Sequence, residues 1–195
     1  MNRIDDERIK FYLKHQQRID EWAALSREVP SLAHRFLCSC QDDIEALAGE
    51  LGPDLPVHAH LESDYPKLLL YRPAWHPQNT HHEASIPPRI GIGIEWRHKD
   101  VTFSCHESSA YAGVWVDCGN DAGRHFRDKA VSAFRAAGLL KEPRRNLATS
   151  WWPSYKWVPA DGEYWDDLSL YRQQLVDSVR DCWLKFAPTI DRLVA

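Results

Sequence analysis

The stretch RIGIGIEWR, residues 89–97, alternates large apolar side chains with glycines and charged residues. The apolar positions are Ile90, Ile92, Ile94 and Trp96, and the positions between them are Gly91, Gly93, Glu95 and Arg97. Side chains of a β-strand point alternately to the two faces of a sheet, so this spacing predicts a strand with one face against a hydrophobic layer. Glycines inside a strand favour a close approach to its backbone. We expect the approaching group to be the C-terminal helix, a partner surface or a nucleotide.

Other stretches on both sides of this strand also have the composition of strands. KLLLYR (67–72), AYAGVWVDC (110–118) and the tryptophan-rich segment 151–158 each predict a strand, and VTFSCH (101–106) predicts a short strand or part of a hairpin. We expect Gly113 and Trp115 to lie beside the glycines of 89–97. Alternation along 151–158 places Trp151, Tyr155 and Trp157 on one face and Trp152, Lys156 and Val158 on the other.

Helical spacing of apolar residues occupies the two ends of the chain and one internal segment. It predicts helices over 4–28 and 31–49, separated by Pro30 and folded as an antiparallel hairpin. It also predicts a helix from Asp121 to Leu139 and a long helix from Tyr164 toward residue 193, which Pro188 bends or ends. The predicted fold is α+β: an N-terminal helical hairpin (1–52), then, over 53–195, a mixed or antiparallel sheet of about four strands, a crossing helix and a long C-terminal helix. We expect the two parts to form one compact unit.

The bulk properties exclude several classes of protein. The 195 residues carry a net charge of −4, which gives no global attraction to nucleic acid or to an anionic membrane. The charged amino terminus and the lack of a long apolar run predict a soluble, cytoplasmic protein without a membrane segment. Five cysteines, an odd number, fit a reducing compartment better than a disulfide framework.

The predicted order helix–strand–strand–strand–helix–strand resembles the core of the PD-(D/E)xK nucleases. That resemblance implies a divalent metal held by Glu95 and Asp117, with help from Arg97 and from the loop that contains Arg144 and Arg145. The motif is incomplete, because no lysine stands two residues after Asp117. A solvated strand end explains Glu95, Arg97 and Asp117 equally well.

A second resemblance covers residues 89–194, from IGIGIEW through AYAGVWVD to the tryptophan-rich strand and the terminal helix. This region looks like a domain of unknown function that follows nuclease-like domains in prokaryotic restriction and defence proteins. The resemblance implies a genomic neighbourhood and brings no catalytic motif with it.

Histidines gather in the irregular region between residues 58 and 82. His58 and His60 form a His-x-His pair, which puts both rings on one side of an extended segment, and His81 or His82 would complete an open zinc site. These spacings match no established zinc signature, so we favour solvated loop histidines over a metal site.

Without a complete catalytic set, the leading hypothesis is a non-enzymatic, protein-binding accessory or regulatory factor of a prokaryotic or phage defence or anti-defence system, with no cofactor. Tryptophan and arginine carry much of the energy of protein interfaces. The expected contact residues are Trp115, Trp152, Trp157, Arg97, Arg144 and Arg145. The alternative is a metal-dependent nuclease, or a nucleic-acid-binding remnant of one, and a homodimer remains open under both hypotheses.

Overall fold

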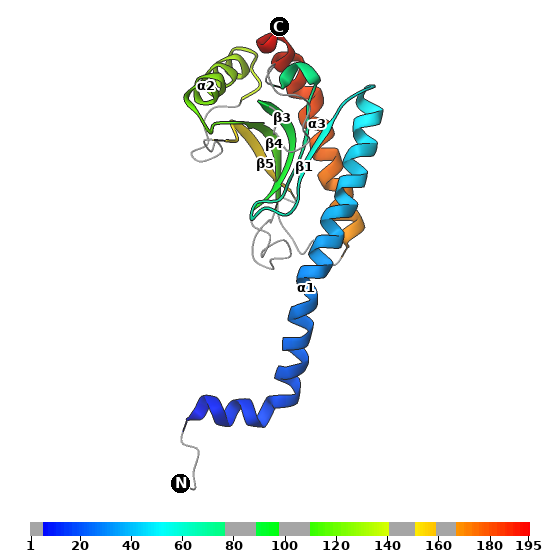
Figure 1. Ribbon diagram of the computed structural model, residues 1–195, viewed down its shortest axis with the longest axis vertical. Helices are drawn as coiled ribbons and strands as arrows, with labels where there is room; N and C mark the ends of the chain where they lie inside the picture. The colour runs from blue at the N-terminus through cyan, green and yellow to red at the C-terminus, as the bar shows by residue number, and fades with distance from the viewer. Residues whose placement is uncertain (1–5, 77–88, 98–109, 141–150, 159–166) are drawn as a thin grey trace.

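The computed structural model describes residues 6–76, 89–97, 110–140, 151–158 and 167–195. In chain order its elements are α1 (Glu7–Leu51), β1 (Val57–His60), β2 (Lys67–Leu70), the 3₁₀ helix η1 (Pro73–Trp75), β3 (Ile90–Trp96), β4 (Ala110–Val116), α2 (Asp121–Ala136), β5 (Ser154–Val158) and α3 (Leu168–Val194) (Figure 1). The predicted α+β class, crossing helix and long C-terminal helix are confirmed.

The strands form one sheet in the order β1-β2-β3-β4-β5, and every neighbouring pair is antiparallel. The sheet therefore has five strands rather than about four. The added strand is β1, which pairs with β2 from Val57 opposite Leu70 to His60 opposite Lys67. The possible strand at 101–106 lies outside the described residues.

One face of the sheet carries the main hydrophobic core. Alternate residues of β2, β3 and β4 lie in one cluster with buried residues of all three helices; from these strands the cluster takes Leu68, Leu70, Ile90, Ile92, Ile94, Trp96, Ala110, Ala112, Val114 and Val116. Figure 1 shows α3 and the second half of α1 on the same side of the sheet. The predicted alternation of 89–97 against a helical layer is confirmed.

Both predicted N-terminal helices are present, but they are two parts of one helix, α1, and the predicted hairpin is wrong. The helix continues through position 30. Proline favours a break locally, yet the stretch between the two predicted helices has no glycine with which to reverse the chain. Buried residues that follow, among them Phe36, Cys40 and Ile44, stabilise the helix beyond the proline by tertiary packing.

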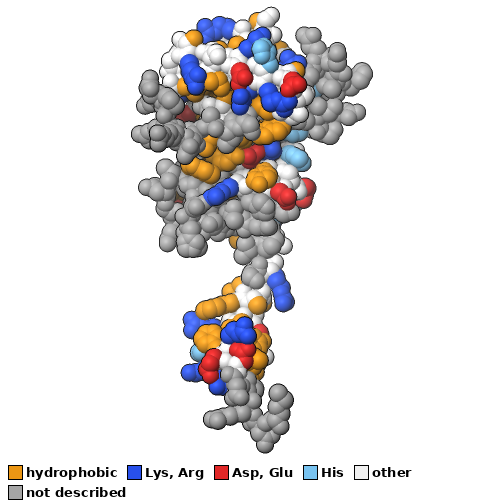
Figure 2. Space-filling view, turned by 90° about the vertical axis from the view of Figure 1, so that its left-hand side faces the viewer, with side chains coloured by type: hydrophobic (Ala, Val, Ile, Leu, Met, Phe, Trp, Pro, Cys, Tyr) orange, Lys and Arg blue, Asp and Glu red, His pale blue; other side chains and the backbone are white. Residues whose placement is uncertain are grey.

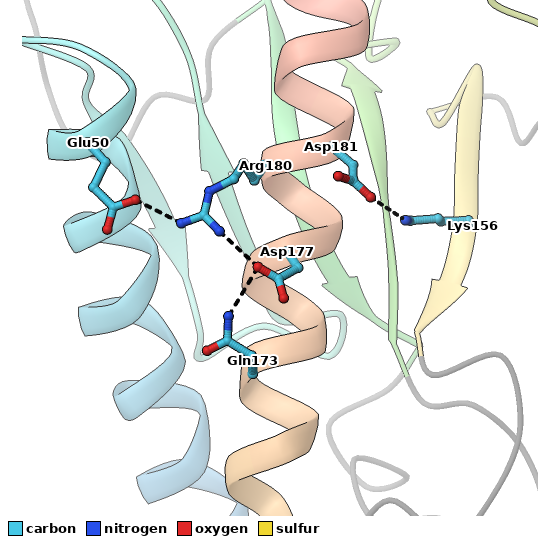
Figure 3. A network of polar contacts seen from close by, with 6 residues as sticks. All are labelled: Glu50, Lys156, Gln173, Asp177, Arg180 and Asp181. Atoms are coloured by element: carbon cyan, nitrogen blue, oxygen red, sulfur yellow. Dashed lines mark hydrogen bonds and ion pairs between the residues drawn. The ribbon is translucent and has the colours of Figure 1, made fainter.

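The second half of α1 is fixed against α3 by stacking and ion pairs. The ring of Phe36 stacks on Tyr171 with centroids 5.4 Å apart, and Arg172 lies 2.7 Å from Asp43. Figure 3 shows Arg180 of α3 between Glu50 of α1 and Asp177 of its own helix, at 2.8 Å from each. These partly exposed pairs set the position of the helices more than they add stability.

Another side of α3 contacts the edge strand β5 (Figure 3). The ammonium group of Lys156 lies 3.4 Å from Asp181 (Figure 3), and Val158 belongs to the main core. Both residues therefore point toward α3, and the prediction that Lys156 and Val158 share a face is confirmed.

Helix α3 does not end at Pro188, which lies inside it. The turns around the proline carry buried Phe186 and Ile190. Their burial stabilises the helix by roughly 1.5–3 kcal/mol per side chain, which offsets the lost backbone hydrogen bond. Within the described part of the chain, no helix combines the length and the apolar character needed to span a membrane.

Candidate functional site

The second face of the sheet, opposite α3, is rich in aromatic side chains. Leu69, Trp115 and Trp152 form a separate buried cluster against which Tyr111 and Tyr155 pack, and none of these five residues belongs to a helix. We call this surface, together with Trp151 and Trp157, the aromatic face. Figure 2 views the molecule from the side on which β5 lies in Figure 1 and shows hydrophobic side chains gathered across the middle of the body.

Two rows of residues cross this face from strand to strand. The first row runs from His60 through Lys67, Glu95 and Tyr111 to Trp157, and each residue lies opposite the next. The second row runs in the same way through His58, Leu69, Gly93, Gly113 and Tyr155. The predicted placement of Gly113 beside the glycines of β3 is confirmed.

The first row contains a buried polar network. The carboxylate of Glu95 is buried, with its Oε2 2.9 Å from the ammonium group of Lys67. The hydroxyl of Tyr111 donates a hydrogen bond to the other oxygen, Oε1. One positive and one negative charge thus compensate each other, which a buried carboxylate requires.

Tyr111 is also the centre of the aromatic packing. Its ring meets those of Trp152 and Trp157 edge to face, with centroids 5.1 Å apart in each case, and that of Tyr155 at 4.9 Å. Edge-to-face contacts are favourable because the positive edge of one ring meets the negative face of the other. The phenol therefore joins the polar network to the half-buried aromatic side chains of β5.

The glycines of the second row are required by the neighbouring strands. A β-carbon on Gly93 would lie 1.8 Å from the carbonyl oxygen of Leu68, and one on Gly113 would lie 2.1 Å from that of Ser154. We expected a helix, a partner surface or a nucleotide to approach these glycines closely. The structure shows that the backbone of the adjacent strand does so instead.

Accessibility divides the predicted tryptophan contacts into two groups. Trp115 and Trp152 are buried, with 4% and 1% of their surface exposed, and therefore serve as packing. Trp157 is half-buried and Trp151 is 38% exposed. Trp152 was expected on the opposite face from Tyr155, which is wrong, because β5 begins only at Ser154 and strand alternation does not extend back to residue 152.

The two carboxylates of the nuclease hypothesis lie at opposite ends of the sheet. Glu95 is opposite Tyr111, and Asp117 follows β4 six residues farther on, which is about 20 Å along a strand. Asp117 accepts a hydrogen bond from the backbone N–H of Gly119 at 3.0 Å. Two ligands of one metal ion share a site only a few ångströms wide, so the structure does not bring this pair together.

The basic residues of the nuclease hypothesis are only partly described. Arg97 is exposed directly after β3, at the same end of the sheet as Glu95. Arg144 and Arg145 lie outside the described residues. The arrangement thus leaves Glu95 next to Lys67 and Tyr111 instead of next to a second acid.

The histidine pair lies on β1, with ring centroids 6.3 Å apart. His58 is buried and His60 is exposed. His81 and His82 lie outside the described residues, and no group of three or more metal-ligating side chains occurs in the part that is described.

Lys67, Tyr111 and Tyr155 complete the site, although sequence reasoning did not single them out. Only the register of the strands could have identified Lys67 and Tyr111. These two residues lie beside Glu95 because β2, β3 and β4 align with Lys67, Glu95 and Tyr111 opposite one another. Such a site offers an apolar, aromatic surface with the ion pair of Lys67 and Glu95 beside it. Both oxygens of Glu95 are engaged, one by the ammonium group of Lys67 and the other by the hydroxyl of Tyr111.

The phenol of Tyr111 makes stability depend on alkaline pH. Burial, and then the charge and hydrogen bond of Glu95, raise the pKa of Tyr111 above its usual 10.0. The unfolded tyrosine ionises near pH 10 while the folded one stays neutral, so its stabilisation is complete below pH 10 and is lost as the pH rises further. We expect the free energy of unfolding to fall by up to about 1.4 kcal/mol per pH unit in that range.

Urea unfolding from about pH 8 to about pH 11 measures this dependence. Burial raises the pKa of the Cys182 thiol from 9.0 to about 11, which adds a loss of stability of the same sign above pH 9. Burial likewise raises the pKa values of the Cys40 and Cys118 thiols and of Tyr71. The variant Tyr111→Phe isolates the contribution of Tyr111, because it should retain these other losses and decline less steeply than the wild type above pH 10. Equal slopes in both proteins would show that Tyr111 ionises normally in the folded state.

No family model matches the chain, and no curated protein or solved structure is significantly similar to it.

Proposed function

We propose that the protein is a non-enzymatic, protein-binding factor that contacts its partner through the aromatic face. The observation that carries the proposal is the pair of half-buried rings Tyr155 and Trp157, which contact each other at the edge of the sheet. Trp151, 38% exposed and stacked on Trp115, extends the aromatic surface farther along the same edge. Aromatic residues of this kind are enriched at the centres of protein interfaces, where rigid rings supply contact area at a low cost in conformational entropy.

The charges of the face favour a protein partner over nucleic acid. The ammonium group of Lys67 lies 5.7 Å from the centroid of the Trp115 ring, and Glu95 compensates its charge at 2.9 Å. Nucleic-acid sites need uncompensated positive charge that follows the phosphates.

The biological setting of the proposal is a prokaryotic or phage defence or anti-defence system in the cytoplasm. Its support is the resemblance of residues 89–194 to a domain that accompanies nuclease-like domains. In that setting the protein acts as an accessory or regulatory subunit that binds another component of the system.

Affinity purification of the tagged chain from a bacterial lysate, with and without nuclease treatment, tests the proposal. We expect a stoichiometric protein that survives nuclease treatment, and we expect Trp157→Ala to reduce its recovery about tenfold or more, the loss typical of an interface hot spot. The matched control is Leu184→Ala, which truncates a side chain 65% exposed on α3 and should bind like the wild type.

Thermal unfolding of both variants shows whether the fold is kept. A folded Trp157→Ala variant that recovers the partner at the wild-type level would contradict the role of the aromatic face. Recovery that depends on nucleic acid would contradict protein binding itself.

A further inference from the structure

The first part of α1 is a helical arm that leaves the body of the protein. Residues 7–32, here called the arm, extend away from the sheet in Figure 1. The arm carries seven large apolar side chains that are exposed, and Phe11, Trp22 and Leu25 are each about 60% accessible; the other four are Ile9, Tyr12, Leu13 and Leu32. Apolar side chains gathered on one exposed segment mark an interaction surface.

The arm is bent near its middle. The hydroxyl of Tyr12 donates a hydrogen bond to Asp20 at 2.9 Å, although eight residues of a straight helix span about 12 Å. Figure 1 shows the corresponding change of direction. The guanidinium of Arg18 also lies over the ring of Trp22 at 4.9 Å, a contact between successive turns of the helix.

The two limbs carry opposite charge. Residues 7–18 contain one acidic side chain, Glu7, which pairs with Lys10 at 2.6 Å, and four basic ones: Arg8, Lys10, Lys14 and Arg18. Residues 19–28 contain three acidic side chains and one basic one: Asp20, Glu21, Glu28 and Arg27. Both limbs also carry exposed apolar residues, with Phe11 on the first and Trp22 on the second.

We propose that the arm pairs antiparallel with the arm of a second copy of this chain. In that orientation each basic limb faces an acidic limb, and both limbs bring exposed apolar side chains, such as Phe11 and Trp22, to the contact. Parallel pairing would instead place basic against basic and acidic against acidic, which is unfavourable. The proposal goes beyond the proposed function, because it uses a different surface and a different partner.

The geometry of the arm suits a two-fold axis. A homodimer with two-fold symmetry uses one self-complementary patch twice. A two-fold axis through the bend, between Tyr12 and Asp20, lays the basic limb of each copy along the acidic limb of the other, so the change of direction is compatible with the pairing. The second half of α1 is already engaged by α3, through Phe36 and Asp43, which leaves the arm as the part of α1 open to a second copy.

Sedimentation equilibrium of the full-length protein tests the pairing. We expect a mass twice the 22.6 kDa of the chain at high protein concentration, with dissociation on dilution. Added salt should raise the dissociation constant, because screening weakens attraction between exposed charges. A mass of 22.6 kDa at every concentration would overturn the proposal.

Charge reversal tests the antiparallel orientation. K10E/K14E/R18E makes both limbs acidic, and D20K/E21K makes both limbs basic, so each should raise the dissociation constant about tenfold or more. The variant that combines all five changes restores opposite limbs and should return the constant to near the wild-type value. The matched control K129E/R135E reverses two exposed charges on α2 and should have no effect.

Three results would contradict the antiparallel arm. Unchanged dimers in both single-limb variants would indicate parallel pairing or another interface. A combined variant as weak as its parents would show that charge does not set the orientation. Binding of the wild-type arm to vesicles of anionic lipid, with no dimer in solution, would replace the second copy by a membrane surface. Unchanged thermal unfolding of the variants excludes misfolding as the cause.

Discussion

Replacing Gly93 by alanine is expected to lower the free energy of unfolding by about 3 kcal/mol or more. The added β-carbon would lie 1.8 Å from the carbonyl oxygen of Leu68 and 2.9 Å from the Cα atom of Leu69. Both atoms belong to the backbone of β2, so relief requires moving one strand of the sheet away from another. Urea denaturation measures the loss as a shift of the transition midpoint.

Gly49 provides the matched control for this substitution. It lies inside α1, and a β-carbon there meets no other atom within 4 Å. Gly49→Ala should stabilise the protein by roughly 0.5–1 kcal/mol, because alanine favours a helix over glycine. A Gly93→Ala variant as stable as the wild type would show that β2 and β3 do not approach each other as closely as described.

Removing the carboxylate of Glu95 is the second large perturbation. Glu95→Ala should cost about 3–5 kcal/mol, because it leaves the largely buried ammonium group of Lys67 without its counter-charge. The hydroxyl of Tyr111 loses its acceptor in the same variant. Asp117→Ala removes a carboxylate that serves one loop hydrogen bond and should cost roughly 1 kcal/mol.

A double-mutant cycle identifies the cause of the loss. If the ion pair is responsible, Lys67→Ala combined with Glu95→Ala should be less destabilising than the sum of the single variants, since neither charge is then left alone. Strictly additive losses would contradict the network. Equal small losses for Glu95→Ala and Asp117→Ala would mean that Glu95 is a solvated side chain.

Local patterns in the sequence predicted most of the individual elements. The strand at 89–97 was predicted because its apolar residues alternate without interruption, and the structure places β3 at Ile90–Trp96. The predicted helix from Asp121 corresponds to α2, which ends at Ala136. In both elements the apolar residues that gave the prediction lie on one face, and the main core buries that face.

The errors arose where distant contacts override a local signal. Pro30 predicted a break, but α1 continues because its later turns pack against α3. Strand β1 has the sequence VHAH, which carries a weak apolar pattern and gains its structure from pairing with β2. A short strand of this kind has no signal of its own.

The candidate site was predictable only in part. Its aromatic content was evident, and Trp157 lies on the expected surface. The burial of Trp115 and Trp152 was not evident, because β4 is buried on both faces and the sequence cannot say which face a helix covers. The pairing of Glu95 with Lys67 depends on the register of β2 against β3, which local patterns do not determine.

Hydroxyl-radical footprinting of the free protein and of the complex purified with its partner tests the central claim most directly. Oxidation is read by mass spectrometry at Trp157, Tyr155 and Trp151, with Leu184 of α3 as the internal reference. We predict that labelling of the three aromatic residues falls several-fold in the complex while that of Leu184 stays the same. Unchanged labelling of the aromatic face, with protection on another surface, would contradict the claim that this face binds the partner.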